Sequence, residues 1–182
     1  VQMDSVIGNK SGKVLLTMFF QNSNLLLAFL RDHNTARSVL EVFNDLYAMF
    51  GRETYCRLFP VILTDRGSEF SNPVPIEQDE NDELRSLVFY CNPSAPYQKG
   101  GIEVAHELVR RVLPKGKSFD DLQQEDIDLM LSHINSYKRG KLNSRSAYQL
   151  FSFIYGDDIL PKLNIHEIEP NDIVLSPKLL KK

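Results

Sequence analysis

Three short apolar segments separated by two polar turns make up the first thirty residues, and this pattern limits the fold more than any other feature of the chain. The segments are residues 1–7, 13–20 and 25–30, and the turns between them are residues 8–12 and 21–24. Such short connections join antiparallel neighbours, because parallel strands need a long crossover. The sequence therefore predicts an opening antiparallel meander, with Asp4 in the middle of its first strand.

Helical and strand patterns alternate after the meander. Apolar residues at helical spacing predict a helix over 35–50, with Asn34 or Thr35 as its cap and Gly51 as its stop. Later segments read as a strand over 60–64, a strand over 87–91, a helix over 124–137 with Tyr137 in its apolar stripe, and a last helix from 146 to 155. This order predicts a mixed α/β domain with antiparallel and parallel strands.

The totals are those of an ordinary globular domain. The 182 residues are 42% hydrophobic and 25% charged, with a net charge of −3, and the longest apolar runs fall short of the roughly 18 residues that span a membrane. We expect a core over 1–155 and a packed extension over 156–182. Because the chain starts without Met and enters a strand at once, we expect an excised domain. Its two isolated cysteines, Cys56 and Cys91, indicate reduced thiols.

The charges are unevenly distributed. Residues 77–85 carry five acids and one base, whereas residues 138–145 carry four bases and no acid. The basic segment contains Lys138, Arg139, Lys141 and Arg145. It is interpreted either as a phosphate-contacting patch or as a solvated loop.

The stretch 97–114 begins as a glycine-bearing turn and continues as an amphipathic helix. Its apolar stripe is Ile102, Ala105, Leu108, Val109 and Val112. A second face carries Glu103, Glu107 and Arg110 at i, i+4 and i+7, and Pro114 ends the helix. An acid in the first turn is ordinarily a surface feature that favours the helix dipole, so this stretch alone does not decide the role of Glu103.

Three acids lie on rigid elements: Asp4 within a strand, Asp65 at a strand end, and Glu103 at a helix start. Asp65 alone would read as a turn residue. Together the three supply the hard oxygen ligands that Mg²⁺ or Mn²⁺ prefers, and two such ions can promote phosphoryl transfer. Divalent-metal catalysis is therefore one hypothesis among several.

The surrounding motifs resemble a known family. Asp4 in its strand, residues 63–70 and residues 97–103 are similar to the three blocks of the DDE catalytic core of retroviral-type integrases, and Glu103 follows Asp65 by 38 positions (103 − 65). Residues 110–116 and 143–151 are most similar to bacterial insertion-sequence transposases of the IS-thirty group. The resemblance covers nearly the whole chain.

The resemblance implies a fold, an activity and a setting. The expected fold is RNase H-like, with a five-stranded mixed sheet flanked by helices. The implied activity is cutting and joining of double-stranded DNA at transposon ends and target, with Asp4, Asp65 and Glu103 holding two Mg²⁺ or Mn²⁺ ions. The resemblance further implies a homo-oligomer in the bacterial cytoplasm, associated with the nucleoid and with no membrane, and a DNA-binding region that lies N-terminal to this chain.

Other residues receive roles from the same resemblance. Lys99, Arg110, Lys138, Arg139 and Lys141 are candidate DNA contacts, and each could equally be a solvated base. Arg66, His106 and Glu107 are expected beside the metal ligands, where they would orient them. Tyr97 is interpreted as a stacking residue or a core residue.

The chain departs from the family pattern at three positions. Arg66, Val104 and His106 stand where asparagine is usual. These departures keep two alternatives open: a non-catalytic core for DNA binding or assembly, and an RNase H-like nuclease that acts on RNA–DNA hybrids.

Overall fold

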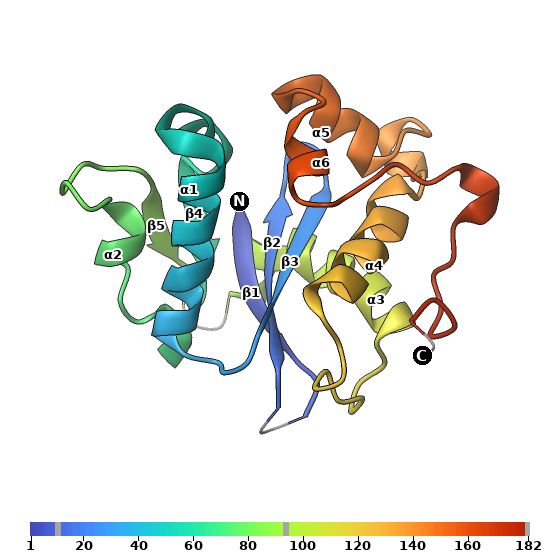
Figure 1. Ribbon diagram of the computed structural model, residues 1–182, viewed down its shortest axis with the longest axis horizontal. Coiled ribbons are helices and arrows are strands. Elements are labelled where there is room, and N and C mark those ends of the chain that lie inside the picture. Colours follow the sequence, from blue (N-terminus) through green and yellow to red (C-terminus); the bar gives the residue numbers. More distant parts are fainter. Residues whose placement is uncertain (10–11, 93–94, 181–182) are drawn as a thin grey trace.

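One mixed sheet of five strands organises the chain, which is described here by a computed structural model over residues 1–9, 12–92 and 95–180. The strand order is β3-β2-β1-β4-β5 (Figure 1). The strands are β1 (Gln2–Ile7), β2 (Val14–Phe20), β3 (Leu25–Arg31), β4 (Val61–Thr64) and β5 (Leu87–Tyr90). The predicted five-stranded mixed sheet is confirmed.

The pairing follows the loop lengths. β1, β2 and β3 form the predicted antiparallel meander, in which Asp4 lies opposite Thr17. β4 and β5 are parallel to β1 and to each other, because long segments containing helices precede both strands. The predicted turn over 8–12 includes Lys10 and Ser11, which lie outside the described residues.

Helices flank the sheet on both sides. Figure 1 shows α1 beside the β4–β5 half, and α4, α5 and α6 beside the β3 edge. The helices are α1 (Ala36–Leu58), α2 (Val74–Glu77), α3 (Gly100–Val112), α4 (Gln124–Ser136), α5 (Ala147–Tyr155) and α6 (Ile159–Lys162). Short 3₁₀ turns are η1 (Ser68–Phe70), η2 (Pro96–Lys99), η3 (Gly140–Leu142) and η4 (Pro170–Asp172).

The predicted start of α1 is confirmed, and its predicted end is wrong. The Thr35 hydroxyl caps the helix by accepting from the Ser38 amide at 3.2 Å. Gly51 does leave the helical conformation, with φ 71° and ψ 164°, but the chain resumes the helix to Leu58. Tyr55 and Leu58 are buried there. Their burial stabilises a further helical segment that the glycine signal alone cannot reveal.

The apolar stripe predicted for α3 is confirmed, since all five of its residues are buried. In α4 the stripe is buried as far as Ile134, but Tyr137 is 41% exposed just past the helix end, so its predicted place in the stripe is wrong. The helix ending at Tyr155 is not the last, because α6 follows. α6 buries Ile159 and Leu160.

Two further features bear on the setting of the chain. Cys56 and Cys91 are free thiols. Among the residues that the structure describes, no helix combines the length and the apolar composition that a membrane span requires.

Candidate active site

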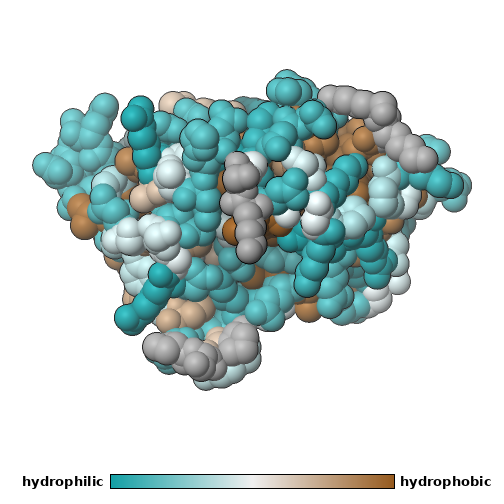
Figure 2. Space-filling view, turned by 90° about the horizontal axis from the view of Figure 1, so that it is seen from below, coloured by the Kyte–Doolittle hydropathy of each residue, from teal (hydrophilic) through white to brown (hydrophobic). Residues whose placement is uncertain are grey.

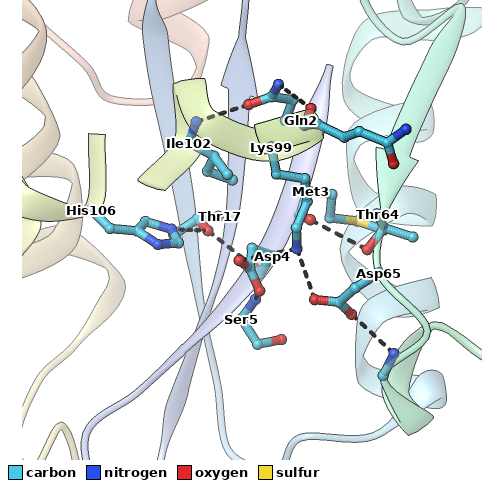
Figure 3. Close-up of polar contacts among 12 residues, drawn as sticks. Gln2, Met3, Asp4, Ser5, Thr17, Thr64, Asp65, Lys99, Ile102 and His106 are labelled. Atoms are coloured by element: carbon cyan, nitrogen blue, oxygen red, sulfur yellow. Dashed lines mark hydrogen bonds and ion pairs between the residues drawn. The ribbon is translucent and has the colours of Figure 1, made fainter. Parts of the chain in front are cut away.

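Two carboxylates on neighbouring parallel strands meet one ammonium group, one from the middle of β1 and one just after the end of β4. Asp4 lies on β1 and Asp65 directly follows β4. Lys99 Nζ lies 3.1 Å from Asp4 Oδ2 and 2.7 Å from Asp65 Oδ2 (Figure 3). Its side chain is only 9% exposed, against 25% for Asp4 and 46% for Asp65. The unfavourable burial of a carboxylate in a central strand is thus offset by an opposite charge.

Backbone amides hold the other oxygen of each carboxylate. Asp4 Oδ1 accepts from the Ser5 N–H at 2.8 Å, and Asp65 Oδ1 accepts from the Gly67 N–H at 2.9 Å. The turn of Asp65 is therefore the Asx-type turn that its position before a glycine indicates. With each Oδ1 occupied, both Oδ2 atoms are left to point at the same position.

The ion pairs also shift the titration of these groups. Burial alone would raise the pKa of Asp65, but the bonds from Lys99 and Gly67 outweigh it, so the pKa lies below its usual value. Burial alone would lower the pKa of Lys99, but its hydrogen bond to Asp65 and the charge of Asp4 raise the pKa above its usual value. Both groups are therefore charged at neutral pH.

Glu103 lies in the first turn of α3 and is exposed. It lines an open groove of about 550 Å³ together with His106, Glu107, Arg110, Arg111 and Lys115. The face predicted from the spacing of Glu103, Glu107 and Arg110 is therefore a real surface. The structure leaves the Glu103 carboxylate in this groove and does not bring it into the Asp4–Lys99–Asp65 ion pairs.

His106 connects the groove to β2 and β1. Its Nε2 lies 2.8 Å from Thr17 Oγ1, and that hydroxyl donates to the Asp4 carbonyl at 2.9 Å (Figure 3). A hydroxyl has one proton to donate, so His106 Nε2 carries the proton in its bond to Thr17. Burial lowers the pKa of His106, and the charge of Asp4 opposes the shift. His106, expected beside the ligands, thus contacts β2 and reaches the backbone of Asp4 only through Thr17.

The remaining basic residues fall into two groups. Lys138, Lys141 and Arg145 are exposed, as DNA contacts would be. Arg66, expected beside the metal ligands, is exposed as well. Arg139 and Arg110 are partly buried instead, and each donates to a backbone carbonyl: Arg139 to Asn24 at 3.4 Å and Arg110 to Ile7 at 3.0 Å. Burial lowers the pKa of both arginines.

The Tyr97 side chain is 79% exposed, so its alternative role in the core is wrong. It stands two residues before Lys99, in the same short turn.

Two polar residues of this region are not predicted from the sequence as part of the site. Gln2 is 4% exposed and bonds the backbone at both Gln98 and Ile102. Arg31 is also buried, and its guanidinium donates to the Ser5 hydroxyl at 3.1 Å, next to Asp4. A polar residue inside an apolar strand is the only sequence hint for Gln2.

The donor set matches a divalent cation in part. Two carboxylate oxygens converge on one point, and the ammonium of Lys99 occupies the position that a metal ion would take. Over residues 1–9, 12–92 and 95–180, no three His, Cys, Asp or Glu side chains are grouped as a metal site would require. The arrangement therefore fits a cation held by a pair of carboxylates, with the third predicted ligand in the adjacent groove.

Known proteins resemble this chain in sequence and in fold. It is 29% identical over 151 residues to the ORF3 protein of Spiroplasma virus SpV1-R8A2 B, which carries an integrase name; the match covers 83% of this chain and 45% of that protein. It is 22% identical over 147 residues to the InsI transposase of insertion sequence element IS30A from Escherichia coli (strain K12), covering 81% of this chain and 36% of that protein. The chain spans less than half of each relative. No family model matches it.

A solved structure gives the same answer for the fold. The catalytic core domain of BIV integrase superimposes with a TM-score of 0.54 at 22% identity, over 85% of this chain and 91% of that domain. This chain resembles a DDE transposase/integrase catalytic core. The resemblance inferred from the motifs is confirmed, and so is the integrase-core architecture of the sheet. The individual site residues of this transposase/integrase-like core remain predictions.

Proposed function

We propose that this chain is the catalytic core of a DNA transposase, which hydrolyses a phosphodiester at a transposon end and joins the freed 3′-hydroxyl to target DNA. One observation carries the proposal: the Oδ2 atoms of Asp4 and Asp65 converge on a single cationic position, and Glu103 lines a groove with basic residues on α3. Relatives named integrase and transposase support the same reaction class.

Asp4, Asp65 and Glu103 would hold Mg²⁺ or Mn²⁺, two ions in the active complex. When bound, such ions activate an attacking oxygen and stabilise a leaving oxygen during phosphoryl transfer. The chain itself contributes positioning. The Ser5 and Gly67 amides fix the two aspartates, and the Thr17–His106 contact ties α3 to the strand of Asp4. Such fixed positioning is most of what this chemistry asks of a protein.

Double-stranded DNA is the proposed partner. The groove beside Glu103 places Arg110, Arg111 and Lys115 next to the carboxylates, where they can bind phosphates. Hydrophilic residues cover most of the molecular face in Figure 2, with smaller apolar patches among them. Lys138 and Lys141, both exposed in the segment after α4, are further proposed DNA contacts. Because two transposon ends are processed together, the active form would be a homo-oligomer, acting at the bacterial nucleoid.

A second candidate has its own supporting observation. Lys99 fills the position between Asp4 and Asp65, and Glu103 lies outside that contact. A core that had lost catalysis and retained only DNA binding or assembly could have this arrangement permanently. The two candidates differ in whether the wild-type chain cleaves DNA.

The test is nicking of supercoiled plasmid by the 182-residue chain in Mn²⁺. Asp4→Asn, Asp65→Asn and Glu103→Gln should each abolish nicking, whereas Glu125→Gln, an exposed acid in the first turn of α4, should retain it. DNA binding by all four variants, measured without a divalent metal, should stay near the wild-type level. Retained nicking by Asp4→Asn would refute the assignment, and binding without nicking by the wild type would favour the second candidate.

A substrate panel separates the remaining alternative. The same proteins are incubated with duplex DNA and with an RNA–DNA hybrid of equal length. Cleavage restricted to the RNA strand would identify an RNase H-like nuclease and contradict the transposase proposal.

A further inference from the structure

The position of Lys99 points to a link between DNA binding and metal binding. We propose that Lys99 is a built-in counter-ion, which occupies the cation position between Asp4 and Asp65 until a DNA phosphate draws its ammonium away. A divalent cation and DNA would then bind cooperatively. This inference rests on the proposed function, and it assigns to one side chain the control of when the site can accept its metal.

The first argument is geometric. Each aspartate has one oxygen bound to a backbone amide and one oxygen bound to Lys99 Nζ. The two oxygens that contact Lys99 belong to residues on neighbouring parallel strands, so the sheet places both carboxylates side by side. The two carboxylates thus form a position for a cation, and the Lys99 ammonium occupies it.

The second argument is exclusion. A magnesium ion needs carboxylate oxygens at roughly 2.1 Å, and the oxygens that it would take are the ones that Lys99 Nζ contacts at 2.7 and 3.1 Å. An ammonium and a divalent ion at adjacent positions also repel each other. Since the Lys99 side chain is 9% exposed, it fills this position and does not merely screen it from the solvent side. Lysine and metal therefore compete for the same two oxygens.

The third argument is that the side chain can move while its backbone stays in place. Gln2 fixes the chain on both sides of Lys99, by donating to the Gln98 carbonyl at 3.0 Å and accepting from the Ile102 amide at 2.8 Å. A lysine carries its charge on a flexible four-carbon stem. Tyr97, two residues earlier, is 79% exposed, so this turn reaches the surface. A swing of one side chain is enough to open the site.

Charge balance gives the direction of the coupling. Two carboxylates and one ammonium sum to −1 in the free protein, whereas adding a divalent ion while Lys99 stays in place would give +1. If the ammonium pairs with a phosphate, the net charge of the two carboxylates and the divalent ion is zero. The net charge of the lysine and the phosphate is also zero. Compensated charges are the favourable state in a partly buried site. DNA should therefore strengthen metal binding, and metal should strengthen DNA binding equally.

The experiment measures Mn²⁺ binding to the whole chain from the electron paramagnetic resonance signal of free Mn²⁺, with and without a short DNA duplex. Wild type is compared with Lys99→Gln and with Lys178→Gln, a control that removes an exposed lysine in the tail. Without DNA, Lys99→Gln should bind Mn²⁺ on the order of tenfold more tightly than wild type, the usual size of a coupling between sites. DNA should tighten binding by wild type and by the control, and should change Lys99→Gln much less.

Equal Mn²⁺ affinity of wild type and Lys99→Gln would overturn the inference. A second measurement on the wild type covers the case in which the variant fails to fold. The ¹⁵Nζ signal of Lys99 should keep its position when Mg²⁺ alone is added and shift when Mg²⁺ and duplex DNA are added together. A shift with Mg²⁺ alone, or none with both, would overturn the inference.

The proposed function and this inference fail in different ways. If Mn²⁺ binding follows the predicted pattern but no plasmid is nicked, the counter-ion role is supported and the catalytic proposal fails. If nicking requires Asp4 and Asp65 while Lys99→Gln leaves Mn²⁺ affinity unchanged, the catalytic proposal is supported and the counter-ion role fails.

Discussion

The Gln2 side chain accepts a hydrogen bond from the Ile102 amide at 2.8 Å, joining the first residue of β1 to the first turn of α3. Its Nε2 donates to the Gln98 carbonyl at 3.0 Å. The two bonded positions enclose Lys99, and Glu103 follows directly. The buried side chain of Gln2, on the same strand as Asp4, therefore fixes the backbone position of Lys99 and of Glu103.

Gln2→Ala should lower both stability and plasmid nicking. The Ile102 amide belongs to the unpaired first turn of a helix, and leaving a buried group of this kind unsatisfied costs about 1–3 kcal/mol. We expect a loss of about 2 kcal/mol in urea unfolding. Gln21→Ala, in an exposed turn, is the control, and an equal loss in that variant would contradict the prediction.

Gly101 and Gly100 offer a matched pair at the start of α3. A Cβ at Gly101 would lie 2.6 Å from the buried Phe19 ring and 3.0 Å from Gln2 Oε1, whereas a Cβ at Gly100 would meet nothing within 4 Å. Gly101→Ala should therefore destabilise the protein by about 1–3 kcal/mol through overpacking. Gly100→Ala should be neutral or stabilising by up to about 1 kcal/mol. Thermal melts of the two variants test this, and similar melting points would refute it.

These contacts show how far the sequence alone can lead. The meander was predictable because short turns leave antiparallel pairing as the only geometry, and the stripe of α3 because helical spacing is a local property. The Asp65 turn was readable for the same reason. By contrast, Lys99 meets Asp4 only because a parallel strand is inserted beside β1, and no local pattern reports that contact.

The misses have equally physical causes. Gly51 leaves the helical conformation as its residue type suggests, yet the burial of Tyr55 restores the helix, so tertiary packing prevails over the local signal. Arg139 belongs to a basic segment interpreted as a phosphate-contacting patch or a solvated loop, but its guanidinium donates to the Asn24 carbonyl, 115 residues away. Charge predicts exposure only where no carbonyl lies within reach of a long side chain.

The edge of the sheet yields a third prediction. Two amide side chains of α4 satisfy the outer backbone of β3: Asn135 exchanges two bonds with Leu26 at 3.0 and 2.8 Å, and Gln124 bonds Leu30 and Ala28. Asn135 is fully buried, whereas Gln124 is only partly buried, so water can replace the latter alone.

Asn135→Ala should therefore cost more stability than Gln124→Ala. The first change leaves a buried N–H and a buried C=O unpaired, a loss of about 2–4 kcal/mol, and the second about 1 kcal/mol. Urea midpoints of both variants provide the measurement. Since an unpaired edge strand also invites association, light scattering should show more aggregation of Asn135→Ala. Equal losses in the two variants would show that α4 does not protect this edge.

His133 should make the packing of the C-terminal segment sensitive to acid. Its ring is 7% exposed, and its Nδ1 accepts from the Val174 amide at 3.1 Å, so the bond requires the unprotonated ring nitrogen. Burial lowers the pKa of His133, and the charge of Asp172 only partly opposes it. The unfolded chain, with a pKa of about 6.5, then binds the proton more readily than the folded protein. The contribution to stability is full above that value and is lost as pH falls through the lower pKa of the folded state.

Urea unfolding at pH 7.5 and pH 5.5 should show a smaller difference in the free energy of unfolding for His133→Gln than for wild type. His33→Gln, which changes an exposed histidine, should show the same difference as wild type. An identical pH difference in all three proteins would mean that the segment after α6 is held without this bond.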